Sequence, residues 1–326
     1  MKNVLAVTWW VMALAGLLII GCNKNNGSGP ADDGTTPPTG ISDERLARLD
    51  LANTFEFGNN DEVTIDDQEL QPTDYGTFGK IDAAITPLRW GRFVTRVVRT
   101  TTDTVRPGDS IAVIHIHKLI SGILKIRALR DTSTVLIEKN FVDSADHNII
   151  FRRFAHGQGR FWWLTNWLPI ATSLVDGRTI SPNNINITAI ELDTPNDTIS
   201  VTDPLNFYLR YPWRRILGPG RKDIPEFNTA ARVLLKATVV SSSPDTDVVA
   251  LRFGMDRFHK RRIPMQCVSQ IPLGANSYQR VFQTQFTMHI FPGFFHVGVD
   301  ALTRETLYDD QAPYSASWWG IPYRVL

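Results

Sequence analysis

The stretch Ser110–Leu129, SIAVIHIHKLISGILKIRAL, decides the fold class of this chain. It is rich in isoleucine, a residue that favours β-strands, and Ser121-Gly122 in its middle is a pair of residue types that favours a turn. The pattern predicts two strands, 110–118 and 123–129, which pair as a β-hairpin. This hairpin is expected to belong to a region dominated by β-strands.

Strand patterns continue on both sides of this hairpin, at the intervals typical of an antiparallel meander. Up to residue 215 the expected strands are 92–99, 110–118, 123–129, 134–141, 148–154, 160–172, 186–192, 198–201 and 206–211. Ser42–Leu51 is the one good helix candidate, because Ser42 can cap it and Leu46 and Leu49 lie on one side. One helix before a long meander resembles the NTF2-like and cystatin-like α+β folds. The region 42–215 is therefore expected to be a β-rich domain, with such an α+β fold as the specific alternative.

The segment 211–225 is rich in proline and glycine, so we place a domain boundary there. Beyond it the expected strands are 231–240, 248–253, 263–269, 278–288, 293–301 and 318–325. Roughly a hundred residues with this strand spacing resemble an immunoglobulin-like β-sandwich. We expect that sandwich over 225–326, with Tyr323–Leu326 as its final edge strand. The expected fold class of the whole chain is mainly β.

The composition excludes several classes of protein. Of the 326 residues, 43% are hydrophobic and 21% are charged, which is typical of a globular protein and rules out a wholly disordered or collagen-like chain. Lys and Arg number 34 against 33 Asp and Glu, so no global positive field exists to recruit nucleic acid. Two cysteines are too few for a scaffold built on disulfides.

The first residues are typical of an export signal. Lys2 precedes an apolar run, Val4–Ile20, and Ile19-Ile20-Gly21-Cys22 resembles the lipobox of bacterial lipoproteins. The resemblance implies cleavage before Cys22, which then carries a diacylglycerol thioether and an acylated amine. Residues 1–21 are thus the expected signal peptide and 22–41 a flexible polar linker. A retained membrane anchor is the alternative, since the run is about as long as the shortest spanning helices, which need ~17–25 residues.

Two histidines are the metal-ligand candidates of the chain. His115 and His117 are two positions apart in an expected strand, so both side chains point to one face and could supply half of a zinc site. Asp143, Asp146 and His147 follow later in the chain, but nothing in the sequence places them nearby. The ordinary alternative is a pair of hydrogen-bonded strand histidines.

The candidates for a ligand-binding surface are aromatic and basic. Trp163 and Trp167 alternate onto one face of an expected strand, where exposed indoles could stack on sugar rings, although strand aromatics more often fill cores. Arg257, Arg261 and Arg262 belong to a basic cluster that could contact anionic lipid or a partner, although a solvated loop is the commoner interpretation.

These observations predict a lipid-anchored protein of the bacterial cell envelope, attached through Cys22 and expected at the outer membrane. No catalytic residue and no cofactor is expected, and the role is expected to be the non-enzymatic binding or support of an envelope protein or glycan, not of nucleic acid. Two alternatives stay open. The first domain could carry a small hydrophobic ligand, or the chain could be an anchored metal-dependent hydrolase using His115 and His117.

Overall fold

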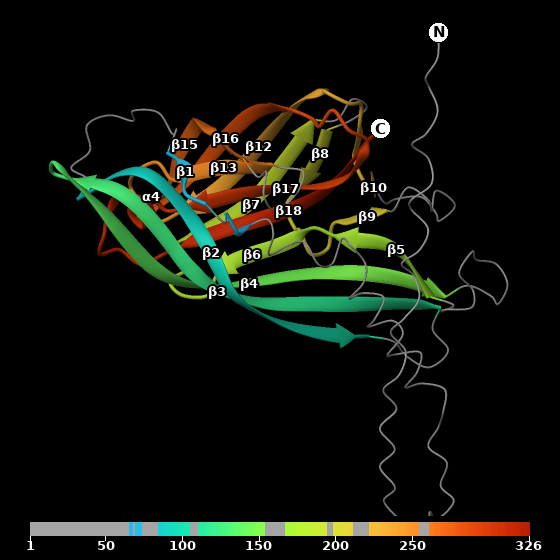
Figure 1. The fold of residues 1–326 in the computed structure, drawn as a ribbon. Helices are drawn as coiled ribbons and strands as arrows, with labels where there is room; N and C mark the ends of the chain where they lie inside the picture. The colour runs from blue at the N-terminus through green and yellow to red at the C-terminus, as the bar shows by residue number, and fades with distance from the viewer. Residues whose placement is uncertain are drawn as a thin grey trace, which may run out of the picture. The chain divides into compact units, whose positions relative to one another are not determined.

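The structure of the chain is a computed structural model. It describes residues 65–67, 69–73, 84–104, 110–153, 167–193, 198–210, 222–253 and 261–326. The expected signal peptide, Cys22, the linker and the expected helix Ser42–Leu51 lie outside the described residues. The mainly-β fold class is confirmed, because nearly all described elements are strands, in two sheets whose neighbouring strands are mostly antiparallel (Figure 1).

The larger of the two sheets has 13 strands, and we call it the large sheet. Its main path runs β1 (Gln71–Pro72), β2 (Thr86–Asp103), β3 (Ile111–Arg130), β4 (Ser133–Arg153), β6 (Val175–Thr179), β18 (Ala316–Val325), β17 (Gly293–Leu302), β13 (Val248–Phe253) and β14 (Arg261–Pro264). Off this path lie β5 (Trp167–Ser173), β9 (Tyr208–Arg210), β10 (Lys222–Asp223) and β11 (Glu226–Phe227).

The small sheet has five strands. Its order is β15 (Gln266–Gly274), β16 (Ser277–Thr287), β12 (Arg232–Ser241), β7 (Ile185–Asp193) and β8 (Thr198–Val201). A short helix, α4 (Arg304–Tyr308), connects β17 to β18. No helix among the described residues is both long enough and apolar enough to cross a membrane.

The stretch that predicted a hairpin forms a single strand instead. β3 runs through Ser121-Gly122 without a turn and pairs with β4 along its whole length. The glycine is there because the ring of Phe141 covers it: a Cβ at Gly122 would lie 2.5 Å from Phe141 Cζ and 2.4 Å from the carbonyl oxygen of Phe93. The true turn is at Asp131, whose φ of 53° is in the left-handed region.

The large sheet curves, so that strands far apart in its order meet. Arg92 of β2 bonds to Asp300 of β17, and Gln71 of β1 accepts hydrogen bonds from Arg262 of β14. The two ends of the sheet are therefore joined by side chains. The face enclosed by this curve, which we call the inner face, carries a hydrophobic cluster whose larger members include Trp90, Ile120, Leu124, Phe141 and Trp318.

The opposite face of β13, β17 and β18 packs on the small sheet. Leu251, Val299 and Trp319 from the large sheet belong to one buried cluster with Leu235 and Phe282 from the small sheet. The alternation of buried and partly buried residues along β12 is the pattern of a strand with one buried face. The two sheets thus form a sandwich with an apolar core.

The expected division into domains 42–215 and 225–326 differs from the strand pairing. β7 pairs with β12, and β6 pairs with β18, so both sheets contain strands from either side of the expected boundary. The residues from Gly40 onward form one compact unit. The pairing also corrects the expected edge strand, since β18 lies between β6 and β17 and nine of its ten residues are buried. Proline and glycine at 211–225 marked a connection within one unit.

Candidate functional site

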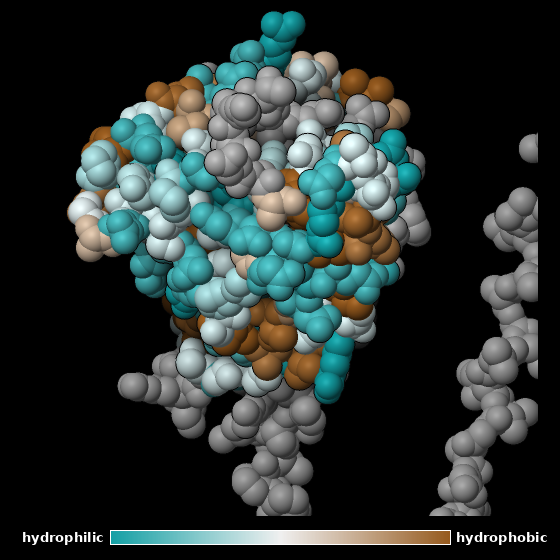
Figure 2. Space-filling view, turned by 90° about the vertical axis from the view of Figure 1, so that its left-hand side faces the viewer, coloured by the Kyte–Doolittle hydropathy of each residue, from teal (hydrophilic) through white to brown (hydrophobic). Residues whose placement is uncertain are grey.

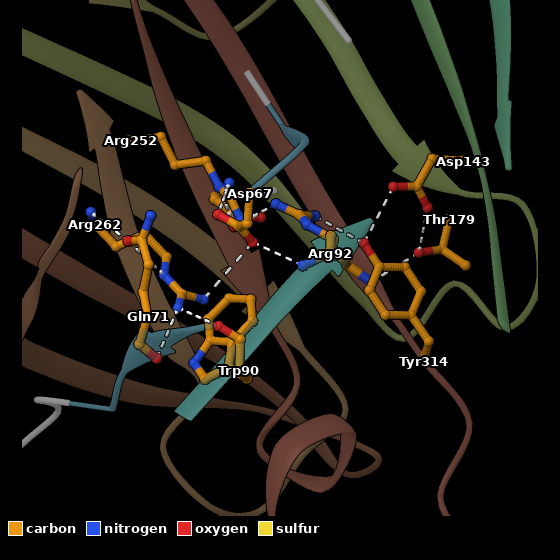
Figure 3. A network of polar contacts seen from close by, with 11 residues as sticks. Asp67, Gln71, Trp90, Arg92, Asp143, Thr179, Arg252, Arg262 and Tyr314 are labelled. Atoms are coloured by element: carbon orange, nitrogen blue, oxygen red, sulfur yellow. Dashed lines mark hydrogen bonds and ion pairs between the residues drawn. The ribbon is translucent and has the colours of Figure 1, made fainter. Parts of the chain in front are cut away.

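A cluster of buried charges lies on the inner face of the large sheet (Figure 3). The Arg92 guanidinium bonds to Asp300 Oδ2 at 2.5 Å, and Nε of Arg252 donates to the same oxygen at 2.8 Å. Arg252 also donates from Nη1 to Asp67 Oδ1 at 2.7 Å and from Nη2 to Asp67 Oδ2 at 3.1 Å. All four side chains are at most 2% exposed. Two carboxylates and two guanidinium groups therefore alternate in a chain that water does not reach.

The cluster extends to the end of the sheet through Arg262. The guanidinium carbon of Arg262 lies 3.5 Å from the centre of the Trp90 ring, which is within the range of a cation–π contact. Its Nη2 donates to the carbonyl oxygens of Gln71 and Trp90, and its Nε donates to the side-chain oxygen of Gln71 (Figure 3). Arg262 thus holds β14 against β1 and β2, the strands at the other end of the order.

A hydrogen-bonded relay leads from Arg92 to the opposite side of the cluster. Arg92 Nη1 donates to the hydroxyl of Tyr314 at 2.8 Å, and that hydroxyl donates to Asp143 Oδ2 at 3.1 Å. Thr179 Oγ1 donates to Asp143 Oδ1 at 3.0 Å and accepts from the backbone N–H of Ala316. The Tyr314 hydroxyl and the Thr179 hydroxyl each accept one hydrogen bond and donate another, which fixes β2, β4, β6 and the start of β18 relative to one another.

The pKa values in the cluster follow from burial and from the nearby cations. Burial raises the pKa of Asp143 to about 6, although Arg92 and the hydrogen bonds from Thr179 and Tyr314 act in the opposite direction. For Asp67 burial also acts upward, but Arg252 and Arg262 outweigh it and hold the pKa below its ordinary value. At pH 7 the carboxyl groups of Asp67 and Asp143 are therefore both largely ionised.

Strand register brings these residues together. Asp300 on β17 is directly opposite Ala250 on β13 and Trp318 on β18. Arg252 is two positions after Ala250 on β13, so the side chains of Arg252, Asp300 and Trp318 share the inner face. Gly177 continues the row on β6, and a Cβ there would lie 2.0 Å from Cε2 of Trp318. The absence of a side chain at Gly177 is what lets the indole lie against the sheet.

The arrangement determines what the cluster can do chemically. Its guanidinium groups are already engaged by carboxylates and carbonyl oxygens, so the described contacts are those of a connector between strands and not of an open anion receptor. Among the described residues, the buried atoms here without a hydrogen-bond partner include Arg92 Nε, Asp300 Oδ1, Trp90 Nε1 and Trp318 Nε1.

The histidine pair is close to a third candidate ligand. His117 Nδ1 lies 2.8 Å and His115 Nε2 lies 3.1 Å from the same oxygen, Oδ1 of Asp146, because Asp146 is opposite His117 on β4. His115 Nδ1 also contacts the side-chain oxygen of Asn148 at 2.9 Å. In the described part of the chain, no group of three or more His, Cys, Asp or Glu side chains is arranged to hold a metal ion. What the structure places here is a pair of half-exposed, hydrogen-bonded strand histidines.

Two of the residues expected on a ligand-binding surface, Trp167 and Arg262, are buried. Trp167 is 2% exposed and packs with Ile114 and Phe151, and Arg262 is buried in the cluster described above. Both expectations of a ligand-contacting side chain are therefore corrected. Trp163 and Arg257 lie outside the described residues, and Arg261 is described only by its place in β14.

The sequence did not identify most of the charged cluster. Asp67 lies in a segment with no expected strand, and Arg92 and Asp300 lie in the expected strands 92–99 and 293–301, with nothing in either pattern that singles them out. A signal does exist in retrospect: Arg252 and Asp300 stand inside strands that are otherwise apolar, VVALRF and GFFHVGVDAL. A charge in such a strand needs a buried partner of opposite sign.

Comparison with known proteins adds no relative: no family model, curated protein or solved structure matches this chain significantly.

Proposed function

We propose that this chain is a lipid-anchored protein of the bacterial cell envelope, attached through Cys22 at the outer membrane, with a non-enzymatic binding or structural role. The observation that carries the proposal is the order of features at the start of the chain, where Lys2, the apolar run Val4–Ile20 and Gly21-Cys22 follow one another. Several acyl chains on Cys22 would hold the protein firmly, since each buried CH₂ contributes ~0.8 kcal/mol.

The described residues support the structural part of this proposal. Asp67, Arg92, Arg252 and Asp300 bond mainly to one another, and they join strands from the two ends of the large sheet. Buried charges used in this way fix the position of strands instead of acting on a substrate. The proposed role is therefore that of a folded domain with a fixed strand arrangement, held at a membrane surface by its lipid anchor.

The anchor is tested by metabolic labelling with a palmitate analogue, followed by fractionation of the cells. The wild-type chain is expected to take up the label and to sediment with the membranes. Cys22→Ser is expected to lose both properties. Cys267→Ser is the matched control, because it removes the other cysteine of the chain, which lies in β15, and is expected to change neither. A wild-type chain that takes up no label would contradict the anchor.

The binding role is tested separately by cross-linking in intact envelopes. The lipidated protein is expected to capture a specific envelope protein or polymer, and the capture is expected to be lost after unfolding. If intact, correctly anchored protein captures nothing above the background of an unrelated lipoprotein, the binding role is wrong, while the anchor itself stands.

A further inference from the structure

The hairpin of β15 and β16 ends in an apolar tip, which we define as residues 268–276. Val268 is 50% exposed, Ile271 is 52% exposed and Leu273 is 54% exposed, and no residue from 268 to 276 is buried. Large aliphatic side chains that are half exposed and close together in one element indicate a contact surface. Figure 1 shows β15 at the margin of the small sheet, and Figure 2, which views that side of the molecule, shows hydrophobic patches separated by hydrophilic side chains.

The tip also lacks charge. From Gln266 to Gln279 the sequence QCVSQIPLGANSYQ contains no Asp, Glu, Lys or Arg. The next charged side chain, Arg280, is fully buried and paired with Asp247 at 2.6 Å. Moving this hairpin into a less polar medium therefore requires no charge to leave water, which is the largest obstacle to such a transfer.

The uncharged region continues on the outer face of the small sheet. The rows nearest the tip contain Gln279, Val240 and Asn186 and then Val281, Thr238 and Ala189. The first charged row is Lys236 beside Glu191, whose side chains are paired at 3.3 Å. The outer face is thus neutral towards the tip and charged farther away.

The backbone edge of β15 is unsuited to pairing with another strand. Its register with β16 shifts between Cys267 and Ser269 and again between Pro272 and Gly274, and Pro272 has no N–H to donate. Irregularities of this kind block strand addition from a partner or a second copy. What the tip offers is its side chains, and a fluid hydrocarbon medium needs no matching strand geometry.

We propose that the apolar tip of the β15–β16 hairpin rests in the surface of the lipid bilayer to which the chain is anchored. This inference builds on the proposed function, because the lipid on Cys22 keeps a bilayer within reach. The 42 residues between Cys22 and Ile65 span at most about 150 Å when fully extended. The first described residues lie beside β14, because Asp67 contacts Arg262 of that strand, and β14 directly precedes β15 in the chain.

The depth of insertion is limited by the backbone. The outer edge of β15 has no neighbouring strand among the described residues, so its N–H and C=O groups need water or lipid headgroups as partners. Ile271 and Leu273 therefore enter only the headgroup and upper acyl region, to a depth of ~5–10 Å.

The test uses the full-length lipidated protein in vesicles of phosphatidylethanolamine and phosphatidylglycerol. In a Cys267→Ser background, Ile271→Cys carries an environment-sensitive fluorophore, and Gln285→Cys is the matched control on the exposed outer part of β16. The probe at 271 is expected to emit at shorter wavelength. A nitroxide near the lipid headgroups is expected to quench the probe at 271 at least about twofold more than it quenches the probe at 285. The same nitroxide is expected to quench the probe at 271 more than a nitroxide placed in the middle of the acyl chain does.

The outcomes separate this inference from the proposed function. If the protein floats with the vesicles but the two probes behave alike, the membrane-resting tip is wrong and the anchor stands. If the protein takes up no lipid and does not float, both are wrong. If the unlabelled Ile271→Cys protein forms disulfide-linked dimers through residue 271, and the emission of the labelled protein is the same without vesicles, a second copy covers the tip and the inference is overturned.

Discussion

The two cores of this molecule differ in how far they depend on charge. Between the sheets, Leu235, Val299 and their neighbours form a large apolar cluster, and the charged residues beside it are the buried pair Arg280 and Asp247. On the inner face of the large sheet, a hydrophobic cluster surrounds Arg92 and Asp300, which are both fully buried. The apolar core follows from the alternation of residues within each strand. The charged one depends on pairs of residues about 200 positions apart, whose contact fixes how the large sheet curves.

This difference has an energetic meaning. A buried ion pair adds little net stability compared with well-packed apolar groups, but removing one partner leaves an unpaired buried charge. The charged core therefore contributes more to the choice of one strand arrangement than to the total stability. The following substitutions are arranged from the largest expected effect to the smallest.

The first substitution breaks the charged core. Asp300→Asn keeps the size of the side chain but leaves Arg92 and Arg252 without the carboxylate that they share. We expect the free energy of unfolding to fall by about 3–5 kcal/mol, measured by urea denaturation. Glu191→Gln is the control, because its pair with Lys236 is exposed and is expected to contribute less than about 1 kcal/mol. Equal effects of the two would contradict the special position of the inner-face charges.

The second substitution tests the apolar core. Leu235 is fully buried between the sheets, and Leu235→Ala is expected to lower the free energy of unfolding by about 3 kcal/mol through lost contacts and a cavity. Leu234→Ala, the next position on β12 but on the outer face, is the control with a small expected effect. An effect at Leu235 above that of Asp300→Asn would reverse the proposed ranking of the two cores.

The third concerns Asp143, whose folded pKa of about 6 lies above its ordinary value of 3.8. The folded state binds the carboxyl proton of Asp143 more tightly than the unfolded state does. The stability that this proton gives the folded state is therefore fully present below pH 3.8 and is lost as the pH rises through 6. Between about pH 4.5 and pH 7.5 the wild type should lose about 2 kcal/mol relative to Asp143→Asn, which carries no ionisable group there. Parallel stability curves for the two proteins would show that this carboxyl titrates normally.

The smallest effect is expected for Arg262→Lys. A lysine keeps the charge but loses the planar contact with Trp90 and part of the bonding to Gln71. We expect a loss of about 1–2 kcal/mol in thermal or urea unfolding. Arg324→Lys provides the reference, since Arg324 is 38% exposed beside Glu226 and is expected to change stability little. A neutral result at Arg262 would mean that β14 is held against β1 by other contacts.

The sequence allowed prediction of the strands and not of their partners. β12 and β17 were expected, and β3 was expected as two shorter strands, because their residues alternate or favour strands, which is a local property. Gly122 was misread as a turn because a glycine that makes room for an aromatic ring looks the same in sequence as one that turns the chain. The boundary at 211–225 failed for a similar reason, since proline and glycine mark any connection, within a domain or between two.

The candidate site was harder to predict than the fold. Arg92 and Asp300 are 208 positions apart, and the sequence near Asp300 indicates that it needs a buried partner without indicating which residue that is. Only the curvature of the large sheet brings them together. The proximity of Asp146 to His115 and His117 was equally hidden, although a strand continuing through Ser121-Gly122 would have placed His117 opposite Asp146.

The position of β18 has a consequence for biogenesis. A ribosome synthesises all the other described strands of the two sheets before it reaches residues 316–325. These last residues nevertheless lie in the middle of the large sheet, between β6 and β17. A nascent chain that stops short of β18 has two unsatisfied strand edges in the middle of its larger sheet, and it exposes the surfaces on which Trp318 and Trp319 would pack. The large sheet therefore becomes continuous from β6 to β17 only when residues 316–325 are in place.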